Sequence, residues 1–126
     1  MITDLNARLD FYRKGLEGLW TRNEVISNNI ANASTDNFQS RDINFEKVMN
    51  EYMSKMRSED FSPDHGRFKY NIEYKRGLPV NANGNNVNVD KEMVSLAENQ
   101  MKYDLMTQAL KYQLNLFNTV ISESKG

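Results

Sequence analysis

Residues 89–121 read VDKEMVSLAENQMKYDLMTQALKYQLNLFNTVI. Apolar residues recur in this stretch at alternating steps of four and three, which is the a/d pattern of a coiled-coil helix. Asp90 or Asn88 can cap such a helix, and Glu92 stands in its first turn, where the helix dipole favours an anion. The sequence therefore predicts a long helix over residues 89–123. Its seam runs through Met93, Leu96, Gln100, Tyr103, Thr107, Leu110, Leu114, Phe117 and Ile121.

The beginning of the chain carries a second seam of the same kind. Apolar residues again recur in steps of four and three, with Asn23 as the polar exception, and Thr3 or Asp4 can cap the helix. This pattern predicts a helix over residues 3–31, roughly 40 Å long at 1.5 Å per residue. Its seam consists of Leu5, Leu9, Tyr12, Leu16, Leu19, Asn23, Ile26 and Ile30.

Two long helices with matching seams favour pairing with each other. We expect an antiparallel coiled coil within the chain, in the register that sets Leu19 against Tyr103. The same register sets Asn23 opposite Gln100. A buried polar pair of this kind lowers stability but penalises slipped registers. The alternative is that both side chains face solvent.

The middle of the chain predicts shorter elements. Polar residues dominate residues 32–43 and favour a loop, and Asn44 can cap a short helix over residues 44–57. Residues 58–88 contain both prolines and an asparagine-rich turn, and the alternation within residues 67–74 predicts a short strand or an extended arm. We therefore expect one domain over all 126 residues, mainly α, with an irregular or short β middle segment.

The carboxyl-terminal helix carries a second apolar stripe beside its seam. A helix that is apolar on most of its circumference is usually buried on most of its circumference. The short helix over residues 44–57 spans only about 20 Å and cannot cover the whole stripe. We therefore interpret the stripe as a candidate contact with other subunits. It consists of Met101, Leu105, Ala109, Tyr112, Leu116 and Val120.

Two glycines interrupt the amino-terminal helix away from its seam. Gly15 and Gly18 each weaken the helix by about 1 kcal/mol relative to alanine. Two explanations remain open: tolerance at the surface, or close approach of a neighbouring helix at positions where a side chain would not fit.

Composition excludes several classes of function. Sixteen basic and seventeen acidic residues give a net charge of -1 without a block of Lys or Arg, so the charge pattern of a nucleic-acid binder is missing. Nothing indicates direct lipid binding either. The absence of cysteine excludes disulfides and thiolate metal sites. No run at the amino terminus has the character of a Sec signal peptide, so we expect no Sec-dependent export.

Catalysis or metal binding would need converging ionisable groups. The single histidine, His65, lies in the turn-like run PDHG at residues 63–66, with no cysteine or second histidine to accompany it. The asparagine-rich segment around Gly84 does not fit the register of a calcium loop. We therefore expect no enzyme, no metal site and no cofactor.

Two runs of sequence resemble a known family. Residues 27–38 read SNNIANASTDNF, with RDINF at 41–45, and residues 83–93 read NGNNVNVDKEM, with LAENQ at 96–100. Both runs closely resemble the signatures of the bacterial flagellar rod and hook proteins, in the right order. Asp36 departs from the pattern, since the family commonly has proline there. The motif residues are Asn28, Asn29, Ile30, Ala31, Asn32, Thr35, Asn37 and Phe38.

The polar motif residues have two possible roles. The side chains of Asn28, Asn29, Asn32 and Thr35 can fix the exit from the first helix through hydrogen bonds to the backbone. Direct contact with a neighbouring subunit is the alternative.

The resemblance implies a structural subunit of the proximal rod of the flagellar basal body, which polymerises helically into the axial drive shaft, transmits torque and encloses the export channel. The implied partners are copies of the chain, other rod proteins, proteins at the junction of membrane ring and export gate, and the flagellar type III export apparatus. The implied location is the rod that spans the periplasm or cell envelope, reached without a Sec signal peptide.

Alternative functions remain for the same helices. One is another axial or export-system component, such as a different rod subunit or an adaptor. Distal rod and hook proteins of this family carry large middle domains that a chain of 126 residues lacks. Another is a free-standing helical adaptor, which would fold as a stable monomer.

Overall fold

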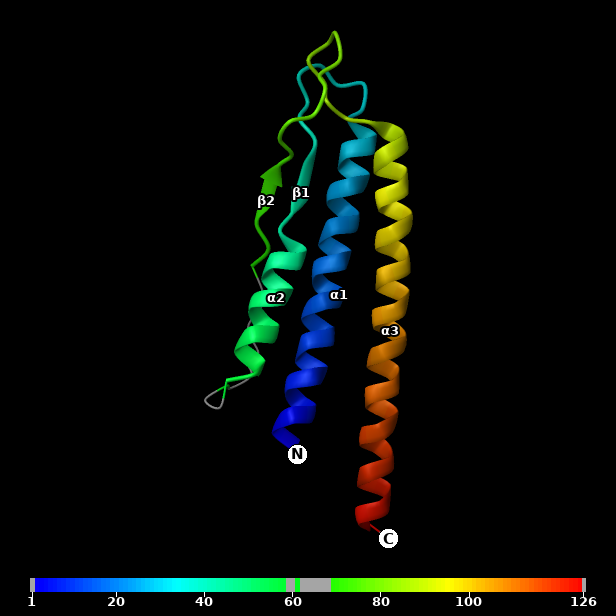
Figure 1. Cartoon of the computed structure of the whole chain (residues 1–126). Helices are drawn as coiled ribbons and strands as arrows, with labels where there is room; N and C mark the ends of the chain where they lie inside the picture. The colour runs from blue at the N-terminus through cyan, green and yellow to red at the C-terminus, as the bar shows by residue number, and fades with distance from the viewer. Residues whose placement is uncertain (1, 59–60, 62–68, 126) are drawn as a thin grey trace.

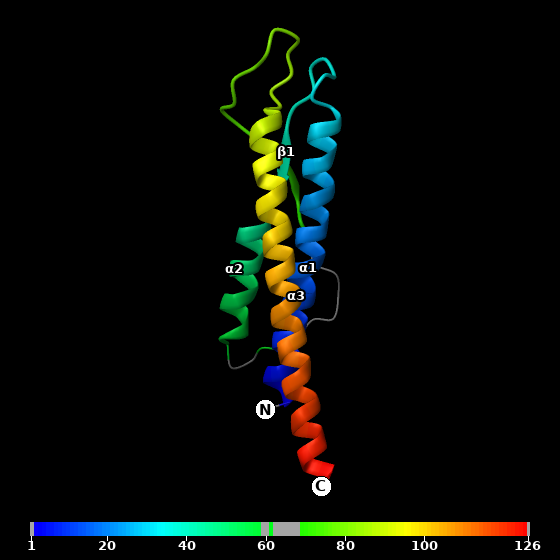
Figure 2. The same cartoon turned by 90° about the vertical axis from the view of Figure 1, so that its right-hand side faces the viewer.

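A long helix lies at the centre of the structure, a computed structural model that describes residues 2–58, 61 and 69–125. Figures 1 and 2 show the first and last helices running antiparallel, side by side, while the short helix and the strands lie along another side of the first. The elements in chain order are α1 (Ile2–Ala31), β1 (Arg41–Ile43), α2 (Phe45–Met56), β2 (Ile72–Tyr74) and α3 (Val89–Lys125). The predicted mainly α fold, with two long terminal helices packed together and a short third helix, is confirmed.

The two strands form a small antiparallel sheet. Arg41 pairs with Tyr74 and Ile43 pairs with Ile72. β2 lies within the segment for which the sequence predicts a strand or extended arm, although residues 67–68 of that segment lie outside the described residues. β1 occupies the end of the segment expected to be a loop, because three residues are too few to show the alternation of a strand.

The core lies where α1, β1 and α2 meet. Buried residues from these elements form one cluster, and partly buried side chains from α1, α3 and the chain before β2 pack against it. The rings of Phe45 and Tyr70 stack with their centroids 5.9 Å apart. The cluster consists of Leu19, Val25, Ile43, Phe45 and Met49, with Phe11, Tyr70, Tyr103 and Met106 around it.

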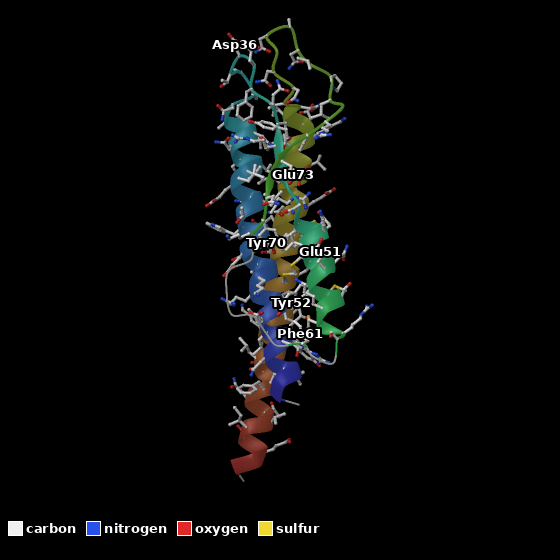
Figure 3. The ribbon with its side chains drawn as sticks, turned by 90° about the vertical axis from the view of Figure 1, so that its left-hand side faces the viewer. Asp36, Glu51, Tyr52, Phe61, Tyr70 and Glu73 are labelled. Carbon is white, nitrogen blue, oxygen red and sulfur yellow. The ribbon has the colours of Figure 1, made fainter. Side chains whose placement is uncertain are left out.

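Both glycines of α1 face this core. A Cβ at Gly15 would collide with the Met106 thioether, and a Cβ at Gly18 would collide with the ring of Tyr70 and come within 2.8 Å of Phe45. Figure 3 shows Tyr70 beside α1. Of the two explanations that the sequence left open, close approach of a neighbouring helix therefore holds at Gly15, where Met106 of α3 is the neighbour. At Gly18 the nearest neighbour is Tyr70, which lies outside the helices.

The helix caps differ from expectation at two of three places. α1 begins at Ile2, so Thr3 and Asp4, the expected caps, lie inside its first turn. Asn44 precedes α2, but its side chain makes no cap hydrogen bond, because Asn44 Oδ1 accepts from the backbone N–H of Asn71 at 2.8 Å. Asn44 thus extends the pairing of the two strands. At the start of α3, Asn88 Oδ1 accepts from the N–H of Lys91 at 3.1 Å, so Asn88 is the cap of the last helix.

The molecule has two unlike ends. The connections from α1 to β1 and from β2 to α3 gather at one end, the loop end, with Asp36 near its tip (Figures 1 and 3). Both termini lie at the other end, the free end, where α3 extends beyond α1 in both views (Figures 1 and 2). Within the described residues, none of the helices is long and apolar enough to span a membrane.

Candidate assembly surfaces

Asn29 joins α1 to β1 at the loop end. Its side-chain Nδ2 donates to the carbonyl of Arg41 at 2.7 Å, and its Oδ1 accepts from the Arg41 N–H at 3.0 Å. The amide therefore satisfies both backbone groups of one strand residue, as the backbone of a neighbouring strand would do. Because Asn29 is fully buried, this edge of β1 is closed by a side chain of the family motif.

Glu92 is a buried anion at the centre of the same end. Only 3% of its surface is exposed, and its carboxylate accepts hydrogen bonds from Ser40 Oγ at 2.8 Å, Lys75 Nζ at 2.7 Å and Asn29 Nδ2 at 3.2 Å. A buried charge is tolerated when an opposite charge and further hydrogen bonds compensate it. Glu92 therefore ties the start of α3 to the end of α1 and to the chain on either side of the sheet.

The asparagine-rich segment before α3 completes this polar cluster. Asn85 Nδ2 donates to the carbonyls of Asn32 and Thr35, at 2.8 and 2.7 Å. These carbonyls follow the end of α1, where backbone acceptors lack helical partners. Asn86 Oδ1 accepts from the N–H of Ser40 at 2.6 Å. The segment therefore holds the first motif in place. We call Asn29, Ser40, Asn85, Asn86 and Glu92 the loop-end cluster.

The other motif residues lie around the exit from α1. Asn32 Nδ2 donates to the Asn28 carbonyl at 2.8 Å, and Thr35 Oγ1 donates to Asn32 Oδ1 at 3.1 Å. Asn37 has a positive φ of 59° and donates its N–H to the carbonyl of Asn83. Phe38 is partly buried, with the Arg41 guanidinium 5.5 Å from its ring. Ile30 is partly buried, whereas Asn28 and Ala31 are exposed.

The α1 side of the predicted seam faces inward along its length. Leu19 and Ile26 are buried, and the remaining members are partly buried. These partly buried members are Leu5, Leu9, Tyr12, Leu16, Asn23 and Ile30.

The α3 side of the seam needs a correction at three of its nine positions. Leu96, Tyr103, Leu110 and Phe117 are partly buried, as are Thr107 and Ile121, but Met93, Gln100 and Leu114 are exposed. The neighbouring residues Glu92, Asn99 and Met106 contact α1 instead. The physical reason is that a helix of 3.6 residues per turn drifts away from a strict seven-residue repeat. The free space at Gly15 and the carbonyl of Leu19 then receive Met106 and Asn99.

The predicted polar pair of Asn23 and Gln100 is therefore wrong. Gln100 is exposed and donates to Asp104 on its own helix at 3.1 Å. Asn99 is buried instead, and its Nδ2 donates to the Leu19 carbonyl at 2.8 Å. The predicted register is nearly kept, because Tyr103, which the sequence sets against Leu19, packs against the buried cluster that contains Leu19. A polar residue, Asn99, does lie between the two helices, but its partner is a backbone carbonyl of α1 and not a second polar side chain.

A second buried charge cluster lies nearer the free end. Asp10 accepts from the hydroxyl of Tyr52 at 2.5 Å and lies 3.3 Å from the ammonium of the fully buried Lys14. Burial by itself raises the pKa of Asp10, but the hydrogen bonds from Tyr52 and Arg13 and the charge of Lys14 lower it below its usual value. Tyr52 also meets Phe61 edge to face, with the ring centroids 5.5 Å apart. Figure 3 shows the two side chains near each other. These contacts fix α2 against α1.

The second stripe of α3 faces away from the rest of the chain. Met101, Leu105 and Tyr112 expose 64%, 63% and 61% of their surfaces. Leu116 and Val120 are also exposed, and Ala109 is partly buried. Scattered exposed apolar residues are ordinary, but a continuous row of large ones marks an interaction surface. We call these six residues the α3 stripe.

Comparisons with known proteins agree with this arrangement. The sequence profile of the family described as "Flagella basal body rod protein" matches residues 14–39. The flagellar basal body rod protein FlgB of Borreliella burgdorferi is 33% identical over 95% of this chain and 99% of its own length. FlgB of Bacillus subtilis is 32% identical over 82% of this chain and 84% of its own length. The chain belongs to the FlgB family of flagellar basal body rod proteins. FlgB of Escherichia coli is 28% identical over 90% of this chain.

Membership in the FlgB family confirms the resemblance carried by the two motif runs. The structure adds that these runs, far apart in the sequence, meet in the loop-end cluster. The sequence did not identify Ser40, Asn85 or Asn86 as part of such a cluster, because polar residues in a loop have the same composition whether they bind solvent or each other. The excess of asparagine in both runs is the signal from which the cluster could have been predicted, because an asparagine side chain both donates and accepts hydrogen bonds.

The described part of this FlgB-family chain contains no group of three or more His, Cys, Asp or Glu residues that could hold a metal ion. Burial and the charge of Glu17 raise the pKa of Tyr70, so its hydroxyl stays protonated and donates to the Lys14 carbonyl at 2.9 Å. This is a structural bond. His65, expected to be a solvated turn residue, lies outside the described residues.

Proposed function

We propose that the chain is a structural subunit of the proximal flagellar rod that polymerises helically and carries torque without catalysing a reaction. The FlgB family supports the rod as its location. Helical polymerisation, the enclosed export channel and the absence of enzyme activity belong to the proposal.

The observation that carries this proposal is the α3 stripe. It exposes a row of large apolar side chains along the helix that lies beside α1 and extends beyond it at the free end. Such a surface is unfavourable in water and is covered when another helix packs against it. A subunit whose apolar surface is covered only in the assembly fits a rod, whereas a free-standing adaptor would cover most of this surface in the monomer.

Torque transmission requires stiffness rather than chemistry. The loop-end cluster and the Asp10 cluster tie α1 to α3 and to α2 through buried charged groups. Close-packed protein interiors have low compressibility, so a load applied to one helix passes to its neighbours. The subunit is thus suited to a shaft.

The partners follow from the same proposal. They are copies of the chain, other rod proteins, and the proteins at the junction of the membrane ring and the export gate. Export by the flagellar type III apparatus to a rod that spans the periplasm is consistent with the lack of cysteine. Direct lipid binding and nucleic-acid binding are not part of the proposal.

A substitution in the α3 stripe tests this function. In cells that build flagella from this chain, Leu105→Glu places a charge in the middle of the stripe, and we expect the chain to be lost from purified basal bodies together with swimming motility. Gln108→Glu is the matched control, since Gln108 is exposed on the same helix outside the stripe. Circular dichroism of both purified variants checks their folding. A folded Leu105→Glu chain that still enters the rod and supports motility would refute the proposal.

A further inference from the structure

The turn before α3 contains the only Asn-Gly pair of the sequence, Asn83-Gly84. Asn83 is exposed to solvent, and Gly84 has a positive φ of 79°. An asparagine followed by glycine reacts with its own backbone more readily than other asparagines, because no side chain crowds the nitrogen of the next residue and glycine adopts many backbone conformations. The pair therefore places an exposed side-chain amide next to an uncrowded backbone nitrogen.

The fold requires both members of this pair. A Cβ at Gly84 would collide with the side-chain oxygen of Asn37, and the positive φ would strain most other residues. Asn83 contributes its carbonyl, which accepts from the Asn37 N–H at 2.9 Å, and its Oδ1, which accepts from the Asn85 N–H at 3.2 Å. Replacing either residue would loosen the turn, so the structure retains the pair for reasons unrelated to its reactivity.

The hydrogen bond from the Asn85 N–H also has a chemical effect. When a nucleophile attacks Cγ of Asn83, negative charge develops on Oδ1, and a donor already held at this oxygen stabilises that charge. The nearest backbone nucleophile is the nitrogen of Gly84, whose N–H donates to the Asn81 carbonyl at 2.9 Å. That bond has to open before the nitrogen can attack. Asn81, Ala82 and Asn83 are all exposed, and exposed loop tips open at low free energy, so the folded turn permits the reaction.

We propose that Asn83 is a site of spontaneous isoaspartate formation in the folded chain, whether or not the chain is a rod subunit. The Gly84 nitrogen loses its proton to water and bonds to Cγ of Asn83, while the Cγ–Nδ2 bond breaks and Nδ2 leaves as ammonia after taking up a proton. Water then opens the resulting succinimide ring at either of its carbonyls. Opening at Cγ gives aspartate, and opening at the former backbone carbonyl gives isoaspartate. Both products carry a carboxylate in place of the neutral amide.

The isoaspartate product changes the backbone as well as the charge. The chain then runs through Cβ and Cγ of residue 83, so the link to Gly84 is one methylene longer. Both sides of this link are tied to the segment after α1, since the Asn83 carbonyl accepts from Asn37 and the Gly84 carbonyl accepts from Gln39 Nε2 at 2.8 Å. A longer link cannot keep both bonds at their present geometry. The modification therefore acts where the two motif runs meet.

Ageing of the purified full-length chain tests the inference. The chain is kept at mildly alkaline pH and digested at intervals, and electron-transfer fragmentation distinguishes aspartate from isoaspartate at each position. We expect conversion at Asn83 to be at least about tenfold faster than at Asn81, which corresponds to about 1.4 kcal/mol in the barrier. Asn81 is the matched internal control, because it is exposed in the same turn but is followed by Ala82. Equal rates at the two residues would overturn the inference.

The same chain unfolded in urea shows whether the folded turn permits the reaction. We expect Asn83 to convert in both samples. Conversion in urea without conversion in the folded chain over the same time would overturn the inference, because the turn would then hold the Gly84 nitrogen away from Cγ.

Amide exchange after ageing checks the structural consequence. In the isoaspartate form, separated by chromatography, we expect the Asn37 N–H to exchange faster than in the fresh chain. Asn83→Asp is the control, since it adds the same charge without lengthening the backbone, and its Asn37 N–H should exchange as in the fresh chain. Unchanged exchange in the isoaspartate form would contradict the effect on the contact between the motif runs.

Discussion

The loop end and the free end of the molecule use opposite kinds of interaction. At the loop end, buried asparagine, serine and glutamate side chains satisfy one another and the backbone within the chain. Toward the free end, α3 carries large apolar side chains that no residue described by the structure covers. Directional hydrogen bonds fix one geometry, whereas apolar surface accepts a partner of suitable shape. The loop end is thus satisfied within the chain, and under the proposed function the free end is completed on assembly.

Hydrogen exchange of the isolated chain is expected to give the largest difference between the two ends. Backbone amides bonded within the loop-end cluster, such as those of Ser40 and Val87, should exchange roughly a thousandfold more slowly than amides of residues 119–123. Amide exchange followed by NMR at low concentration measures both sets in one sample. Equal protection at both ends would remove the contrast and favour a self-sufficient adaptor.

Glu92→Ala is expected to destabilise the loop-end cluster. Removing the carboxylate leaves Lys75 and the Ser40 hydroxyl without their buried acceptor, which should lower the free energy of unfolding by about 3 kcal/mol. Urea denaturation followed by circular dichroism measures the loss. Glu98→Ala is the control, because Glu98 is exposed on the same helix. A loss below about 1 kcal/mol would show that the cluster contributes little to stability.

Gly18→Ala tests the packing of the hydrophobic core, which lies between the loop end and the free end. The new methyl group collides with the stacked rings of Tyr70 and Phe45, which support each other and cannot move separately. We expect a net destabilisation of about 2 kcal/mol, although alanine favours the helix. Gly15→Ala is the comparison, since the flexible Met106 thioether can move aside and the loss should be smaller. Equal losses in thermal or urea unfolding would contradict this account.

A smaller, pH-dependent effect is expected from the Asp10 cluster. The pKa of Asp10 in the folded chain lies below its unfolded value of about 3.9. Its stabilising contribution is therefore complete above that value and is lost as the pH falls through the folded pKa. Urea unfolding from pH 6 to pH 2 should show this loss, with a shallower slope for Asp10→Asn. The pH dependence of stability should not vanish in Asp10→Asn, because Glu46 also contributes to it. Burial raises the pKa of Glu46, but a backbone hydrogen bond and the charge of Arg22 outweigh burial and lower this pKa below its usual value.

Asp104→Asn serves as the control for the acid experiment. Asp104 is exposed on α3, so its replacement removes a carboxylate without touching the Asp10 cluster. An Asp10→Asn profile that coincides with the wild-type profile would exclude Asp10 as a source of the acid sensitivity.

The sequence predicted what depends on periodicity and missed what depends on distant partners. The two long helices follow from repeats of three and four, and Leu19 and Ile26 are buried as the α1 seam requires. The choice of Asn99 over Gln100 depends on where the Leu19 carbonyl lies, which no local pattern encodes. β1 is defined by a partner strand and by the Asn29 amide, so three residues of its own sequence could not predict it.

The sequence was enough to recognise the family motif, but the hydrogen bonds that its residues make are known only from the structure. Asn29 and Glu92 stand 63 residues apart, and their hydrogen bond links the two motif runs. Composition indicated that the asparagines prefer turns, but the bonds that Asn85 makes to the carbonyls after α1 depend on the complete fold. The α3 stripe, by contrast, was visible as a surplus of apolar residues that no predicted element could cover.

The amide of Asn29 is also a group whose chemical loss would damage the loop end. Deamidation converts asparagine to aspartate and replaces the Nδ2 donor with an anionic oxygen, which would then face the Arg41 carbonyl and the Glu92 carboxylate. One spontaneous hydrolysis would thus turn two attractions into two repulsions. Burial within a helix holds the side chain and the following backbone nitrogen away from the geometry of this reaction, so folding protects the residue on which the fold depends. Loss of this particular amide is consequently a risk of the unfolded chain.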